Sequence, residues 1–237
     1  MVRRAVGMDR PAKEETVTSH RIGQGSALVF GVGPGLGSSV VQAFRSAGLD
    51  VTAVARREAS LEGLDGGHAD GGSVTTVVAD ATDDEAVRRI VADAKSASGH
   101  LDVVVYNAAV VRPDEPGELS AIEHMERLDI NALGALRVAN AVLSSRHLGR
   151  RTTVLMTGGM PEPKAPYTSL SVGKAALRTV VRVLDEAHSS ELVRIGMVTP
   201  DGPIRPGTTL DPEVIAQEYV AFHSAATQPW RIERILA

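Results

Sequence analysis

The chain has 237 residues, of which 43% are hydrophobic and 23% charged, and its formal net charge is −4. These values are typical of one soluble domain with a full core, and they exclude the basic field that attracts nucleic acid or anionic membranes. Cysteine is absent, which excludes disulfides and thiolate chemistry and fits a cytoplasmic protein. No apolar run reaches the roughly 18 residues that a membrane helix needs. We therefore expect no membrane partner, no nucleic-acid partner and no metal site.

The first segment of the chain differs from the rest. Residues 1–24 carry Arg, Lys and Glu but no apolar core segment, so they do not form a secretory signal. We expect 1–24 to be a flexible leader and 25–237 to form one domain.

A glycine-rich turn follows the first apolar run, Ala27 to Phe30, and precedes an amphipathic stretch from about Ser38 to Ala47. This order of strand, turn and helix is the context that a dinucleotide-binding loop requires. Glycines permit the tight turn and let the backbone approach a pyrophosphate, which then lies on the helix N-terminus. The segment predicts a phosphate-binding loop, with an ordinary turn as the alternative.

Strand and helix patterns alternate through the rest of the chain. We expect strands at 50–55, 74–79, 101–106, 152–157 and 193–199 and helices at 83–98, 119–146, 168–187 and 211–222, with a weaker helix at 58–64 and a loop at 66–72. The strands are apolar runs rather than alternating ones, as expected when both sheet faces are buried. Repeated βα units of this kind predict an α/β fold: a single-domain, doubly wound, Rossmann-like parallel sheet of six or seven strands with helices on both faces.

The second strand is followed by Arg56 and Arg57. In a doubly wound sheet this strand end lies beside the adenine ribose, where an acidic residue binds the 2′-hydroxyl and an arginine can hold a 2′-phosphate. Two arginines without an acid favour NADP(H) over NAD(H). The alternative is a pair of solvated arginines.

Several motifs together resemble those of the short-chain dehydrogenase/reductase family over roughly residues 26–205. They are the spacing Gly31-x-x-x-Gly35-x-Gly37, the pair Asn107-Ala108 after the fourth strand, and the run Lys174-Ala175-Ala176-Leu177. The resemblance implies cofactor contacts from Gly31, Gly35, Leu36, Gly37, Asp80, Ala81, Asn107, Ala108, Lys174, Gly202 and Ile204. It also implies a homodimer or homotetramer. The chain departs from the family at Phe30, Tyr106 and Ala109, where Thr, Asn and Gly are usual.

The catalytic segment departs further. The family places a Ser at the end of the fifth strand and a Tyr four residues before the Lys, so that the ammonium lowers the pKa of the phenol. Here Thr157 stands near the Ser position and Leu170 stands at the Tyr position. Leucine cannot transfer a proton. Asn131, a poor residue for a helix interior, matches the family Asn that holds a water in a proton relay.

Three explanations for the missing Tyr stay open. Tyr167, seven residues before Lys174, could donate the proton from a loop or helix start. The substrate could instead be an activated C=C with another proton source, or the site could perform no redox chemistry at all.

The sequence thus predicts an NADP(H)-dependent oxidoreductase that reduces a carbonyl or activated C=C of a small, natural-product-like molecule. Thr157 would orient the substrate, Lys174 would hold the ribose, Asn131 would support a water relay and Tyr167 would be the acid. Residues 200–225 would form a substrate loop or lid. The alternatives are a non-redox enzyme (isomerase, cyclase or dehydratase) on the same fold and a nucleotide-sensing protein without catalysis.

Overall fold

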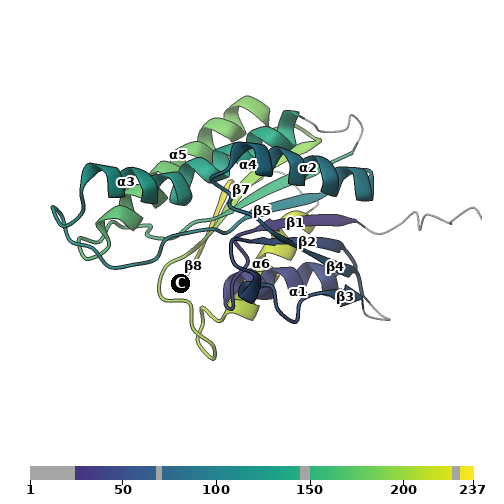
Figure 1. The fold of residues 1–237 in the computed structure, drawn as a ribbon, viewed down its shortest axis with the longest axis horizontal. Helices are drawn as coiled ribbons and strands as arrows, with labels where there is room; N and C mark the ends of the chain where they lie inside the picture. The colour runs from purple at the N-terminus through teal and green to yellow at the C-terminus, as the bar shows by residue number, and fades with distance from the viewer. Residues whose placement is uncertain (1–24, 68–70, 145–149, 226–229) are drawn as a thin grey trace, which may run out of the picture.

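The computed structural model describes residues 25–67, 71–144, 150–225 and 230–237. One sheet runs through the molecule, with helices on both of its faces (Figure 1). The expected leader, 1–24, lies outside the described residues.

The sheet has the strand order β3-β4-β2-β1-β5-β6-β7-β8. Its strands are β1 Ser26–Phe30, β2 Asp50–Ala55, β3 Gly66–Gly67, β4 Ser73–Val78, β5 Val103–Tyr106, β6 Thr152–Thr157, β7 Val193–Pro200 and β8 Glu233–Leu236. Every pairing in this order is parallel except that of the two-residue β3 with β4. The expected doubly wound parallel sheet is confirmed, and the order reverses at the β1–β5 pair.

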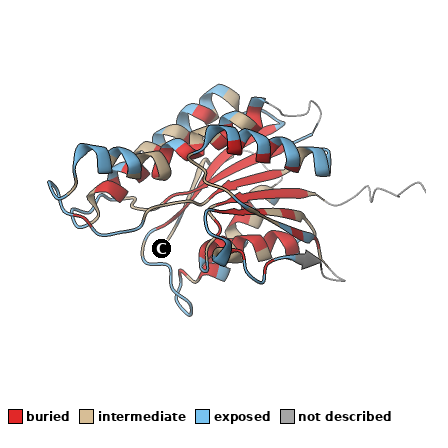
Figure 2. Cartoon of the chain, in the orientation of Figure 1, coloured by how far each residue is buried: buried red, intermediate tan, exposed pale blue. Residues whose placement is uncertain are grey.

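The helices form two layers. Helices α1 Leu36–Ser46 and α6 Pro212–Ser224 cover one face, and α2 Asp84–Ser98, α3 Ala121–Leu128, α4 Gly134–Ser144 and α5 Thr168–His188 cover the other (Figure 1). The central strands between these layers are buried from end to end (Figure 2). This burial explains why they read as unbroken apolar runs.

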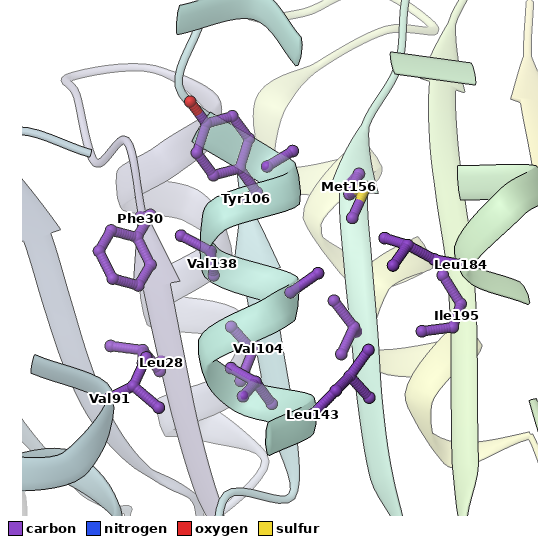
Figure 3. Close-up of a cluster of buried hydrophobic side chains, with 14 of the residues drawn as sticks. Leu28, Phe30, Val91, Val104, Tyr106, Val138, Leu143, Met156, Leu184 and Ile195 are labelled. Carbon is purple, nitrogen blue, oxygen red and sulfur yellow. The ribbon is translucent and has the colours of Figure 1, made fainter. Parts of the chain in front are cut away.

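Each face of the sheet has its own hydrophobic cluster. On the α4 and α5 face, strand residues such as Leu28, Val104 and Ile195 pack against Val138 and Leu184 of the helices (Figure 3). The other cluster joins the sheet to α1 and α6. These two clusters position the strand ends that form the site.

The predicted helix at 119–146 is helical throughout 121–144, but its middle turn is not α-helical. It begins at Ala121, and a capping box between the N-cap residue Ser120 and Glu123 satisfies the first turn. A π-helical turn, η2 Asp129–Leu133, then separates α3 from α4. The segment at 58–64 is only a 3₁₀ turn, η1 Glu58–Ser60.

Strand β8 was not predicted. It contains only four residues, Glu-Arg-Ile-Leu, and it pairs with β7 at the sheet edge. Trp230, just before it, stacks on Phe222 with ring centroids 4.5 Å apart and donates its Nε1 hydrogen bond to the carbonyl of Ile195. Trp230 is therefore a partly buried residue that packs against the core.

Within the described residues, no helix is both long and apolar enough to cross a bilayer. The same part of the chain contains no group of three or more His, Asp or Glu side chains placed to hold a metal ion.

Candidate active site

A cavity of ≈690 Å³ lies where the parallel strands end. It extends from the turn after β1, past the ends of β2 and β4, to the loops that follow β5, β6 and β7. Ligands of doubly wound sheets bind at this carboxyl edge, at the point where the strand order reverses. Most of the predicted site residues line it: Gly31, Leu36, Arg56, Arg57, Asp80, Ala81, Asn107, Ala108, Thr157, Tyr167, Lys174, Gly202 and Ile204. Gly35, Gly37 and Asn131 do not.

The glycine-rich turn has the geometry of an anion-binding loop. Gly31 has φ +83°, and a Cβ there would lie 2.2 Å from the backbone nitrogen of Ala108. A Cβ at Gly37 would lie 2.8 Å from the carbonyl oxygen of Gly31. Around Gly33 and Gly35, in contrast, the space is open.

The N-terminus of α1 follows this turn without a side-chain cap or an acidic residue in its first turn. Its N–H groups and the helix dipole therefore favour an anion over the open glycines. A dinucleotide diphosphate fits this cradle.

The adenosine end of the cavity lies beside β2 and β4. Arg56 and Arg57 are exposed there. Asp80 accepts hydrogen bonds from the backbone N–H and hydroxyl of Thr82, at 2.9 and 2.8 Å, which fixes its carboxylate at the rim.

Thr157 belongs to a directed chain of hydrogen bonds. Asn107 donates through Nδ2 to the carbonyl of Gly31 at 2.9 Å, so its Oδ1 faces Thr157 and accepts the hydroxyl hydrogen at 2.8 Å. The hydroxyl of Tyr219, 2.7 Å from Thr157 Oγ1, must then be a donor. Tyr219 is fully buried in α6, and burial raises the pKa of its phenol.

In this series of hydrogen bonds, the one hydroxyl hydrogen of Thr157 is donated to Asn107. A hydroxyl has one hydrogen, so Thr157 would have to break its bond to Asn107 before it could donate to a substrate carbonyl. The next position offers no replacement, because a Cβ at Gly158 would lie 2.1 Å from Oγ1 of Thr199. The orienting role of Thr157 stays a prediction, and the structure counts against it.

Asn131 lies in the π turn, fully buried. Its Oδ1 accepts the backbone N–H of Val110 at 2.7 Å, whereas Nδ2 has no hydrogen-bond partner among the described residues. Tyr106 supports this turn by donating its hydroxyl to the carbonyl of Ile130 at 2.6 Å. A Cβ at Gly134 would lie 2.2 Å from that hydroxyl, so the Tyr fits only beside glycine. π turns of this kind are frequent at functional sites.

Lys174 lies on α5 with only 4% of its surface exposed. Its Nζ donates to the carbonyl of Thr157 at 2.7 Å and forms no ion pair with the described residues. Burial lowers the pKa of Lys174 to about 8. Leu170, one turn earlier, is equally buried, so no phenol lies one turn from this amine on α5.

Tyr167 is the N-cap residue of α5, not part of the helix. It is half-buried, lines the same cavity as Lys174, and has no hydrogen bond from its hydroxyl within the described part of the chain. The expectation that Tyr167 reaches the site from a loop or helix start is thus supported by its position. Its role as the acid stays a prediction.

Asp114, which the sequence did not single out, holds the start of α5. It accepts the backbone N–H and the hydroxyl of Ser169 at 2.9 and 2.7 Å and an Nη1 hydrogen bond of Arg127 at 3.1 Å. Burial opposes its ionisation, but the hydrogen bonds from Ser169 and the charge of Arg127 keep the pKa of Asp114 below its ordinary value. Asp114 thereby fixes the backbone that carries Tyr167.

We expect Asp114→Ala to lower the free energy of unfolding at pH 7 by about 3 kcal/mol, because Arg127 and the Ser169 hydroxyl lose a buried acceptor. Urea denaturation of both proteins measures the difference. Folding lowers the pKa of Asp114. The difference in free energy of unfolding between wild type and Asp114→Ala should therefore decline as the pH falls below the ordinary carboxyl range. A loss below about 0.5 kcal/mol, as for a typical surface change, would contradict this account.

The predicted lid is smaller than 200–225. Pro200, Asp201, Gly202, Pro203 and Ile204 line the cavity. Helix α6 instead packs against α1 and buries Ile215, Tyr219 and Phe222 in the core. Within the predicted lid, only the loop before α6 therefore lines the cavity.

Comparison with known proteins agrees with this architecture. The profile of the short chain dehydrogenase family matches residues 26–214. A glucose 1-dehydrogenase of Gluconobacter oxydans is 27% identical over 192 residues, which are 76% of this chain and 69% of that protein. An uncharacterized oxidoreductase of Staphylococcus saprophyticus is 28% identical over 207 residues, 81% of this chain and 87% of that one.

Solved structures show the same fold. A metagenomic short-chain oxidoreductase in complex with NADP has a TM-score of 0.78 at 20% identity, covering 90% of this chain and 96% of the other. An NADH-dependent reductase complexed with NAD has a TM-score of 0.74 at 19% identity, covering 90% and 94%. From its matching profile, its sheet order and its glycine-rich turn, the chain belongs to the short-chain dehydrogenase family of oxidoreductases.

Proposed function

We propose that this oxidoreductase uses NADP(H) to reduce a carbonyl or an activated C=C of a small molecule. The observation that carries the proposal is that one cavity joins the open glycine-rich turn and Arg56–Arg57 to Lys174 and Tyr167. Bound NADPH would supply the hydride. The glycine-rich turn would hold its diphosphate, and Lys174 would donate to its nicotinamide ribose.

The preference for NADP(H) rests on Arg56 and Arg57. We expect Arg56→Ala/Arg57→Ala to weaken NADPH binding about 10- to 100-fold, since hydrogen bonds to charged groups contribute roughly 1.5–3 kcal/mol. NADH binding should stay unchanged, because NADH has no 2′-phosphate. Titration calorimetry of cofactor-stripped protein with both nucleotides measures this, and equal loss for the two would remove the arginines from 2′-phosphate recognition.

The proton would come from Tyr167. Two tyrosines, Tyr106 and Tyr167, line the cavity. The hydroxyl of Tyr106 donates to the carbonyl of Ile130, whereas the hydroxyl of Tyr167 has no hydrogen-bond partner among the described residues. Asn131, whose unpaired Nδ2 lies beside Gly173, would hold a water. The strand end offers no uncommitted hydroxyl hydrogen to a carbonyl, which favours an activated C=C as the reacting group.

A panel of ketones and enones tests this function by NADPH consumption. Turnover on an enone with saturated product supports the proposal in its C=C form. NADPH binding without turnover on any compound would favour a nucleotide sensor, and product formation by cofactor-free protein would favour a non-redox enzyme.

A further inference from the structure

The end of the cavity beyond Lys174 has a chemistry that the proposed cofactor does not use. It lies under the loops that follow β5, β6 and β7, on the opposite side of β1 from the arginines after β2. Val111, Met160 and Leu170 give it an apolar surface, and Lys164 adds a charge. We call this part the distal end.

The backbone of Lys164 is firmly held. Its N–H donates to Oγ of Ser171 at 3.0 Å, and its carbonyl accepts the N–H of Tyr167 at 3.0 Å and the Ser171 hydroxyl at 3.3 Å. Ser171 is itself buried in α5. The loop therefore presents Lys164 at a defined place on the cavity wall.

The ammonium of Lys164 has no protein counter-ion. No acidic side chain of the described residues lies within ion-pair distance of it, although Lys164 lines the cavity and is exposed. The cavity wall that Lys164 shares with Val111 and Met160 is otherwise apolar, so an ion pair formed inside the cavity is stronger than one in bulk water. Such a residue is suited to an anionic group of a ligand.

The charge at this end is positive overall. Two lysines, Lys164 and Lys174, line the distal end. They are accompanied by one acidic side chain, Asp201, in the loop that follows β7. Asp80 belongs to the adenosine end, after β4. A substrate with an anion and an apolar body is complementary to this arrangement, whereas a cationic substrate is not.

We propose that the substrate carries a carboxylate, bound by Lys164, on an apolar body that packs against Val111, Met160 and Leu170. The inference rests on the proposed function for the identity of the site, because it makes the distal end the substrate end. The ammonium donates a charge-assisted hydrogen bond to the carboxylate. The reacting group then lies toward Lys174 and Tyr167.

The test is binding, measured without turnover. A library of matched pairs, each an aryl or alkyl carboxylic acid and its primary amide, is screened by ligand-detected NMR against the protein saturated with NADP⁺ and against cofactor-free protein. We expect carboxylates to bind at least tenfold tighter than their amides. Lys164→Met should reduce each carboxylate to the affinity of its amide, and Lys164→Arg should retain the preference.

Arg112→Met is the matched control. Arg112 is an exposed cation on the loop after β5 that does not line the cavity, so its removal should change no affinity. The proposal is overturned if no carboxylate in the library binds tighter than its amide, or if Lys164→Met weakens acids and amides equally. It is also overturned if Arg112→Met has the effect of Lys164→Met.

The experiment separates this inference from the proposed function. A carboxylate preference that depends on Lys164, in protein that does not bind NADPH, would contradict only the cofactor assignment. NADPH binding together with turnover of neutral enones and no carboxylate preference would contradict only the role of Lys164.

Discussion

Lys174→Met should lower NADPH-dependent turnover by at least about 10²-fold, at the lower end of what general acid–base groups contribute. The Lys174 ammonium lines the cavity, donates to the Thr157 carbonyl and has no counter-ion in the part of the chain that the structure describes. Methionine fills a similar volume but has neither the charge nor the hydrogens. The same change should weaken NADPH binding, so kcat and cofactor affinity fall together.

The folding stability of Lys174→Met should not fall with its activity. Burial lowers the pKa of Lys174 to about 8, against an unfolded value near 10.4, so the unfolded chain binds more protons between these values. Wild-type stability should therefore rise as pH increases through this window. Lys174→Met should be at least as stable as wild type below pH 8 and should lack that rise.

Urea titrations from pH 7 to 10.5, beside steady-state assays, measure both effects. Lys174→Arg serves as the control, because it keeps a charge but cannot be deprotonated. Undiminished NADPH oxidation by Lys174→Met would remove this residue from the mechanism.

Tyr167→Phe should reduce kcat by about 10²- to 10⁴-fold, the usual contribution of a positioned proton donor. The change removes one hydroxyl that has no hydrogen-bond partner among the described residues, so the fold and the affinity for NADPH should be unaffected. This pattern differs from that of Lys174→Met, which loses both rate and binding.

Steady-state kinetics and titration calorimetry on the same preparation make the comparison. A Tyr167→Phe enzyme of full activity would show that the proton comes from water or from the substrate itself. That result would retain an activated C=C as substrate and remove the phenol from the reaction.

The sequence predicts the fold well because the parallel strands leave strong signals. Apolar runs such as 27–30 and 152–157 must be buried on both faces, and that requirement is local and easily recognised. Strand β8 is not an apolar run, because two of its four residues are charged. It forms by pairing with β7 at the edge of the sheet, which the local sequence does not indicate.

The site was less predictable, because its polar groups depend on distant partners. Thr157 is a reasonable substrate-orienting residue until its hydroxyl is found to donate to Asn107, 50 positions earlier. Asp114 sits in a loop with no motif, and its partner Ser169 lies 55 positions away. Composition and spacing contain no record of such pairs, whereas the cofactor loop is a continuous segment and was recognised.

The direction of the bonds from Tyr219 through Thr157 to Asn107 limits how protons can reach the site. A proton wire works only if each member can accept a proton on one side and release one on the other. Asn107 ends the row, since its amide nitrogen donates to the Gly31 carbonyl and neither group titrates. This row therefore relays no proton between the buried phenol of Tyr219 and the cavity.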